Sequence, residues 1–119
     1  MAFKFEKLEV WKESVELSSV IHNVTLSFPK DELYVLTSQI KRAADSVSLN
    51  IAEGSTGQTN AEFRRFLSFA IRSGIEVIGC IYLAKKRNLI NEEDFNFIYS
   101  ATDSLVMRIQ ALKKSIPIK

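Results

Sequence analysis

Residues 33–54, LYVLTSQIKRAADSVSLNIAEG, carry a regular row of apolar side chains. The row recurs at spacings of 3, 4, 3, 4 and 4 residues, which is the pattern of a helix that packs along one side. Its members are Leu33, Leu36, Ile40, Ala43, Val47 and Ile51. We therefore predict a helix that begins at Pro29, which suits a first helical turn, and that ends at a left-handed Gly54.

The same stretch carries a second, polar row, which lies about 110° around the helix from the apolar one. This row consists of Gln39, Arg42, Ser46, Asn50 and Glu53. Its spacing fits two interpretations equally well. One is a solvated helix face, because these residue types are common on surfaces. The other is a hydrogen-bonded seam between helices or subunits, which would also include Ser73 and Glu76 of the following helix.

A helix is also predicted ahead of this stretch, over about residues 6–27. Its apolar stripe includes Leu8, Trp11 and Val15. Pro29 ends this helix, because the proline ring disfavours helical geometry at the residue before it.

Two more helices are predicted after the Gly-rich turn. Thr59 and Glu62 match a capping box for the third helix, and Asn88 is placed to end it. Asn91 suits the N-cap of the fourth helix. The core row of the fourth helix is Phe95, Ile98, Thr102, Leu105, Ile109, Leu112 and Ile116.

Four helices with short connections in 119 residues predict a single domain, 1–119. Its fold class is all-α, an antiparallel up-and-down four-helix bundle. A single cysteine excludes an internal disulfide, and the charged N-terminus is unlike a signal peptide, so we expect a cytoplasmic protein. Residues 66–84 approach membrane-spanning length, but Arg72 and Glu76 in their middle favour a buried helix and no membrane partner.

The third helix has more apolar surface than one bundle can cover. Its apolar residues wrap around most of its circumference: Phe63, Phe66, Leu67, Phe69, Ala70, Ile71, Ile75, Val77, Ile78, Ile81, Tyr82 and Leu83. A helix that is apolar on most sides is buried on most sides, and an exposed patch usually marks an interface. We therefore expect a homo-oligomer with this helix in or beside the contact.

The sequence offers no constellation for catalysis, cofactor binding or metal binding. His22 is the only histidine, and Cys80 has no partner motif that would activate its thiol. The Gly-rich segment at residues 54–58 follows a helix and lacks the Lys-Ser/Thr ending of a phosphate-binding loop. We expect a protein that is not an enzyme and that has no cofactor.

The order of these segments resembles a known family. Residues 5–17, 28–54, 61–70 and 73–77 are similar to the four-helix-bundle proteins encoded in bacterial 23S rRNA intervening sequences, and QIKRAADSVSLNIAEG (39–54) is the most specific part. That family is similar to the accessory variability protein of diversity-generating retroelements, a barrel-shaped pentamer that binds nucleic acid and reverse transcriptase. The resemblance implies a ring-like pentamer and makes the polar row a set of signature positions. This favours a structured seam.

Charge supports two functional hypotheses. The net charge is +2, so five copies would carry about +10, and residues 60–119 hold 10 Lys or Arg against 6 Asp or Glu. The first hypothesis is a scaffold that associates with RNA or DNA through phosphate contacts. The alternative is an oligomer whose partner is another protein, such as a reverse transcriptase by analogy. The candidate nucleic-acid contacts are Lys41, Arg64, Arg65, Arg72, Lys85, Lys86 and Arg87.

Overall fold

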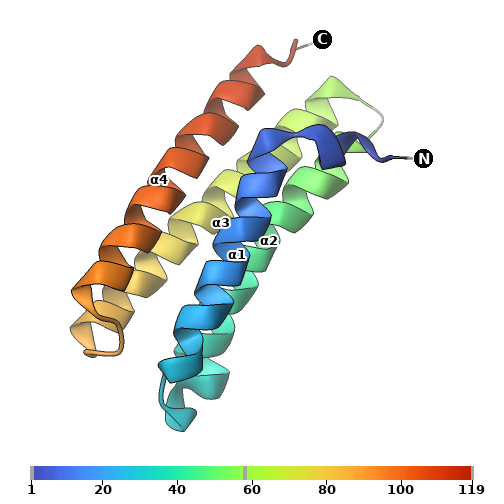
Figure 1. Ribbon diagram of the computed structural model, residues 1–119. Helices are drawn as coiled ribbons and strands as arrows, with labels where there is room; N and C mark the ends of the chain where they lie inside the picture. The colour runs from blue at the N-terminus through green and yellow to red at the C-terminus, as the bar shows by residue number, and fades with distance from the viewer. Residues whose placement is uncertain (1, 58, 119) are drawn as a thin grey trace.

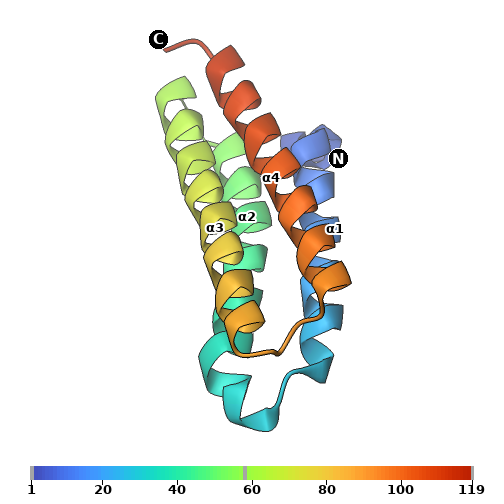
Figure 2. The same ribbon diagram turned by 90° about the vertical axis from the view of Figure 1, so that its left-hand side faces the viewer.

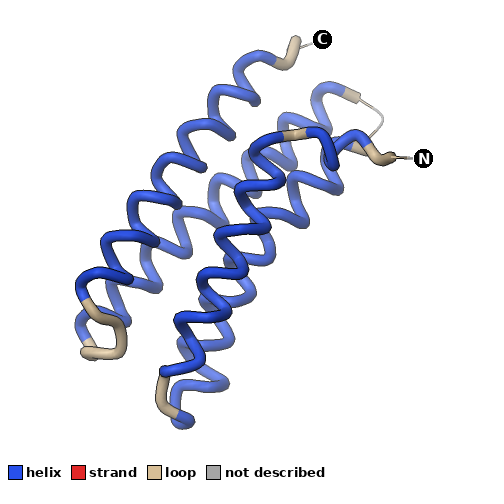
Figure 3. The backbone as a smooth tube through the Cα atoms, viewed as in Figure 1, coloured by secondary structure: helices blue, strands red, loops and turns tan. Residues whose placement is uncertain are grey.

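The computed structural model describes residues 2–57 and 59–118, and every regular element in these ranges is helical. The long helices are α1 (Glu9–Val24), α2 (Ser38–Ser55), α3 (Asn60–Lys86) and α4 (Glu92–Ser115). They run alternately along one bundle axis, as Figures 1 and 3 show, and the molecule measures 46 × 25 × 20 Å. The predicted all-α four-helix fold is confirmed.

The predicted N-cap residues of the last two helices are confirmed, with the Thr59 half of the predicted capping box. The Thr59 hydroxyl accepts a hydrogen bond from the Glu62 backbone N–H at 3.1 Å, and the Asn91 side chain accepts one from the Asp94 N–H at 2.7 Å. Asn88 has a φ of 58°, which is the left-handed geometry that commonly ends a helix. These local signals fix where α3 ends and where both helices begin.

The first two helices are less regular than predicted. A short 3₁₀ turn, η1 (Lys4–Lys7), precedes α1, and a second one, η2 (Thr25–Ser27), follows it. The segment before α2 consists of another 3₁₀ turn, η3 (Lys30–Glu32), and a π turn, η4 (Leu33–Thr37). The residue ranges predicted for the first two helices were therefore too long, because parts of each range are not α-helix. Hydrophobic spacing alone does not distinguish a 3₁₀ or π turn from an α-helical turn.

The predicted role of Gly54 was wrong. No glycine among the described residues has a positive φ, and α2 continues through Gly54 to Ser55. A Cβ on Gly54 would lie 2.4 Å from the Cβ of Phe66 in α3, which is much closer than two carbon atoms can approach. The glycine is needed because the two helices touch there, which the local sequence does not reveal.

The predicted apolar rows form most of the core. Of the α2 row, only Leu33 is exposed; it begins the π turn ahead of α2, and Leu36 in the same turn is buried. Val15 of the first stripe is also exposed. In the α4 row only Leu112 is half-buried. In place of Val15, α1 buries Val10, Ser14, Leu17 and Ile21.

The four helix pairs do not pack equally. α2 and α3 form the largest contact, and α1 and α4 form the smallest. Figure 2 shows α2 and α3 side by side, with α4 crossing between α3 and α1. α3 is also long and apolar enough to cross a membrane, a property that core helices of soluble proteins share, and in this fold it packs against α2 and α4.

Candidate functional site

The centre of the predicted polar seam lies between α2 and α3. The Ser73 hydroxyl donates to the Ser46 hydroxyl oxygen at 3.0 Å. The Asn50 side-chain amide donates to the same hydroxyl oxygen at 2.9 Å and to the Ser46 carbonyl at 2.8 Å. All three side chains are half-buried, and the bond between Ser73 and Ser46 links the two helices inside one subunit, while Asn50 bonds Ser46 within α2.

The ends of the seam are looser. The Gln39 side-chain amide donates to a Glu76 carboxylate oxygen at 3.4 Å in an exposed position, which is a long hydrogen bond. Arg42 and Glu53 are exposed and join neither group. The structure therefore brings together five of the seven seam candidates, as a contact between helices.

Several candidate nucleic-acid residues have partners within the chain. The Arg64 guanidinium donates to the carbonyls of Lys113 at 2.6 Å and Ile116 at 3.1 Å, which satisfies groups at the end of α4. Arg87 pairs with Glu32 at 3.1 Å. Arg87 and Arg64 are therefore held in place by contacts that have a structural purpose.

Two more candidates lie over aromatic rings. The Lys85 ammonium is 4.5 Å from the centre of the Phe95 ring. Arg65 lies 5.8 Å from the ring centre of Phe66 and 5.7 Å from that of Phe69. Within the described ranges, the side chains of the remaining candidates have no such partner; these are Lys41, Arg72 and Lys86.

A basic groove lies between α3 and α4, and we call it the α3–α4 groove. It has a volume of about 680 Å³, and its lining contains four basic side chains and no acidic one. The basic residues are Arg64, Arg72, Lys113 and Lys114, and the others are Ser68, Ile71, Met107, Gln110 and Ala111. Lys113 and Lys114 were missed in the sequence, because cations in the last turn of a helix are expected from the helix dipole alone.

His22 has neighbours that the sequence did not predict. Its Nε2 lies 3.2 Å from Oδ1 of Asp45, and the Ser18 hydroxyl donates to the same oxygen. A hydrolytic triad requires the serine to bond the imidazole, whereas here both side chains meet the carboxylate. The cluster therefore links α1 to α2, and its geometry does not activate Ser18 as a nucleophile.

The Cys80 thiol is buried and is poorly suited to nucleophilic chemistry. Burial and, to a smaller extent, the nearby Glu76 carboxylate together raise its pKa from 9.0 to about 11. Because the thiolate is the reactive form, this environment keeps the sulfur inert at neutral pH. No group of three His, Cys, Asp or Glu side chains in the described ranges is arranged to hold a metal ion.

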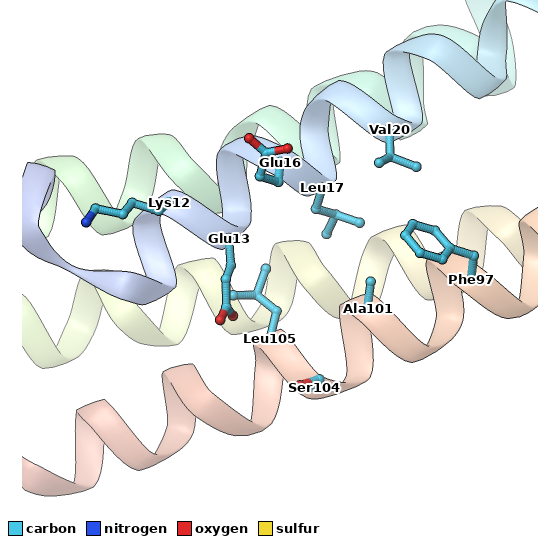
Figure 4. Close-up of a pocket in the computed structure, with 9 residues that line it drawn as sticks. All are labelled: Lys12, Glu13, Glu16, Leu17, Val20, Phe97, Ala101, Ser104 and Leu105. Atoms are coloured by element: carbon cyan, nitrogen blue, oxygen red, sulfur yellow. The ribbon is translucent and has the colours of Figure 1, made fainter.

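An apolar groove lies on a neighbouring side of the bundle, between α1 and α4, and we call it the α1–α4 groove. It has a volume of about 570 Å³. Figure 4 shows Leu17 and Val20 of α1 facing Phe97 and Ala101 of α4. Lys12, Glu13 and Glu16 lie at its edge, and Glu13 also pairs with Arg108 of α4.

Comparison with known proteins identifies the class as a four-helix-bundle family. The profile of the family described as 23S rRNA-intervening sequence protein matches residues 6–111, so the chain belongs to this family. A crystal structure of a protein with unknown function from the S23 ribosomal protein family of Bacteroides thetaiotaomicron has the same fold, with a TM-score of 0.80. It is 21% identical, and the match covers 89% of this chain and 99% of that one. A search of curated protein sequences finds no match.

Proposed function

We propose that this protein is a non-enzymatic, self-assembling scaffold that binds RNA or DNA through the α3–α4 groove. The observation that carries the proposal is the lining of that groove, which contains four cations and no acid. Arg64 is held by the end of α4, so Arg72, Lys113 and Lys114 are the side chains available for phosphates. Such contacts would neutralise the backbone without reading its sequence.

Self-assembly is supported by the outer surface of α3. Phe63, Leu67 and the other inward residues of α3 are covered by the bundle, but Ile75, Tyr82 and Leu83 each remain about half exposed. Exposed apolar residues gathered on one helix are typical of protein interfaces. The family resemblance favours a pentamer, in which several copies of the groove would act on one strand.

The direct test is a fluorescence-anisotropy titration of a labelled single-stranded RNA at several salt concentrations. We expect binding at about 50 mM salt and a linear decrease of log affinity with log salt. The double variant K113A/K114A should reduce the salt slope by about 1.4, which is about 0.7 for each lost phosphate contact on a single strand.

The matched control is K7A/K30A, which removes the same charge from two lysines that do not line the α3–α4 groove. Both lysines are exposed and have no ion pair among the described residues. This variant should keep the wild-type salt slope. The proposal fails if the wild type does not bind at low salt, or if both double variants lose affinity equally. Light scattering on the same samples measures the assembly separately from binding.

The α1–α4 groove favours the alternative, a protein-interaction oligomer. Its floor is apolar, and Glu16 at its edge has no ion pair among the described residues. Such a groove suits an amphipathic helix with a basic residue opposite Glu16. In this case Phe97→Ala, on the exposed side of the groove, would weaken capture of the partner polypeptide. It would leave RNA titrations unchanged.

A further inference from the structure

A hollow smaller than the two grooves lies between α1 and the start of α2, on a different helix pair from the α3–α4 groove. It has a volume of about 360 Å³, which is within the range of small-molecule sites. Most of its lining side chains carry hydrogen-bonding groups, and it includes His22 of α1 together with Tyr34, Thr37, Ser38, Lys41 and Arg42 of the following segment. We call it the α1–α2 hollow.

Two cations line the α1–α2 hollow without an ion pair. Neither Lys41 nor Arg42 has an ion pair among the described residues. The lining also contains the carboxylate of Asp45, and its Oδ1 is already occupied by Ser18 and His22. Lys41 is half-buried and lines the hollow.

The floor of the hollow holds an unsatisfied hydroxyl. Thr37 is only 5% exposed, and its Oγ1 has no hydrogen-bond partner in the part of the chain that the structure describes. It closes the π turn η4, and π turns occur frequently at functional sites. Thr37 and Lys41 also line an adjoining hollow of about 180 Å³ that Lys30 reaches, so a third lysine lies nearby.

The lip of the hollow is aromatic. Tyr34 is 90% exposed, so one face of its ring is free for stacking. The Asp45 carboxylate bonds Ser18 and His22, so Lys41 and Arg42 remain to pair with an anion, and a guanidinium beside an ammonium suits phosphate oxygens. We propose that the α1–α2 hollow binds a phosphate monoester carried on a flat ring, which is the chemistry of a nucleoside monophosphate.

The test is isothermal titration of the full chain with three probes: 5′-AMP, inorganic phosphate and adenosine. AMP and phosphate should bind saturably, and adenosine should bind much more weakly than AMP. K41A/R42A should lower the AMP affinity at least about tenfold, because charge-assisted hydrogen bonds to the phosphate are lost. Y34A should lower the AMP affinity about fivefold or more and leave phosphate binding unchanged.

The matched control is K113A/K114A, which removes the same charge from the α3–α4 groove and should keep AMP binding within about twofold of wild type. Circular dichroism checks that each variant is folded. The proposal is overturned if neither AMP nor phosphate binds, or if K41A/R42A binds AMP as wild type does. Equal losses in both double variants would also overturn it. RNA binding by the groove is measured with other variants, so either proposal can fail alone.

Discussion

The α2–α3 pair and the α1–α4 pair differ in how closely their helices approach. Where α2 meets α3, small residues let the helices approach closely. Gly54 leaves room for the Phe66 side chain, and Ser46 bonds Ser73. Where α1 meets α4, the long side chains of Glu13 and Arg108 bridge the helices beside an apolar groove. The size of the side chains at each contact therefore decides which side of the bundle is closed and which is open.

The largest effect on the free energy of unfolding is expected from truncating a core leucine. The comparison is between one leucine enclosed in the core and one that lines the α1–α4 groove. Leu67→Ala should lower the free energy of unfolding by about 4 kcal/mol, because Leu67 is fully enclosed and the cavity would stay empty. Leu105→Ala should cost about 2–3 kcal/mol, because Leu105 lines the α1–α4 groove, where neighbours can relax into the space. Urea unfolding followed by circular dichroism measures both, and equal losses would remove the distinction between the two sides.

The next effect compares two glycines of α3 that face in opposite directions. A Cβ on Gly74 would lie 2.7 Å from Cγ2 of Val106 in α4, whereas a Cβ on Gly79 would meet nothing within 4 Å. Gly74→Ala should therefore destabilise the fold by about 1–2 kcal/mol through overpacking. Gly79→Ala should stabilise it by about 1 kcal/mol, because alanine is the better helix former.

The Gly79 variant also examines assembly. If Gly79 lies at a close contact between copies, Gly79→Ala will reduce the oligomer mass measured by light scattering instead of raising the unfolding midpoint. A stabilised variant with unchanged mass places the contact elsewhere on α3.

A smaller effect is expected from the hydrogen bonds between α2 and α3. Ser73→Ala removes the donor to Ser46 and should cost about 1 kcal/mol of unfolding free energy. Ser100→Ala on α4 is the control, because Ser100 is exposed and its side chain has no hydrogen bond to any described residue. The control should change stability by less than about 0.5 kcal/mol. Similar values for both variants would mean that the seam adds no measurable stability.

The smallest effect is expected at the ion pair that bridges the open side. A double-mutant cycle with Glu13→Gln and Arg108→Gln should give a coupling energy below about 1 kcal/mol, because both side chains are partly exposed to solvent. A coupling well above this value, measured by urea unfolding, would show that the α1–α4 contact is held more tightly than its geometry indicates.

Local sequence signals gave correct predictions where a feature depends only on residues within about one helical turn of each other. The caps at Thr59 and Asn91 and the left-handed Asn88 depend on residues within a few positions, and all were predicted correctly. The apolar rows succeeded for the same reason, since helical periodicity alone places them on one face. Leu33 was the exception in the α2 row: it begins the π turn, outside the regular α-helix whose periodicity the row follows.

The candidate sites depended on contacts between distant segments. Arg64 and Lys113 are 49 residues apart, and Ser18 and Asp45 are 27 apart, so no spacing rule connects them. The sequence named Arg64 and Arg72 but not Lys113 or Lys114, which complete the lining of the α3–α4 groove. It also gave no indication that the His22 ring meets the Asp45 carboxylate.

By itself the sequence determined the helical class, the caps and the residues that form the core, because hydrophobic periodicity and backbone hydrogen-bonding needs act within single helices. The tertiary structure decided that Gly54 permits a contact between α2 and α3. It also decided that five side chains of the predicted seam meet between these two helices, and that four cations line the α3–α4 groove. These outcomes depend on which helix faces meet, and that is fixed by the packing of the whole chain.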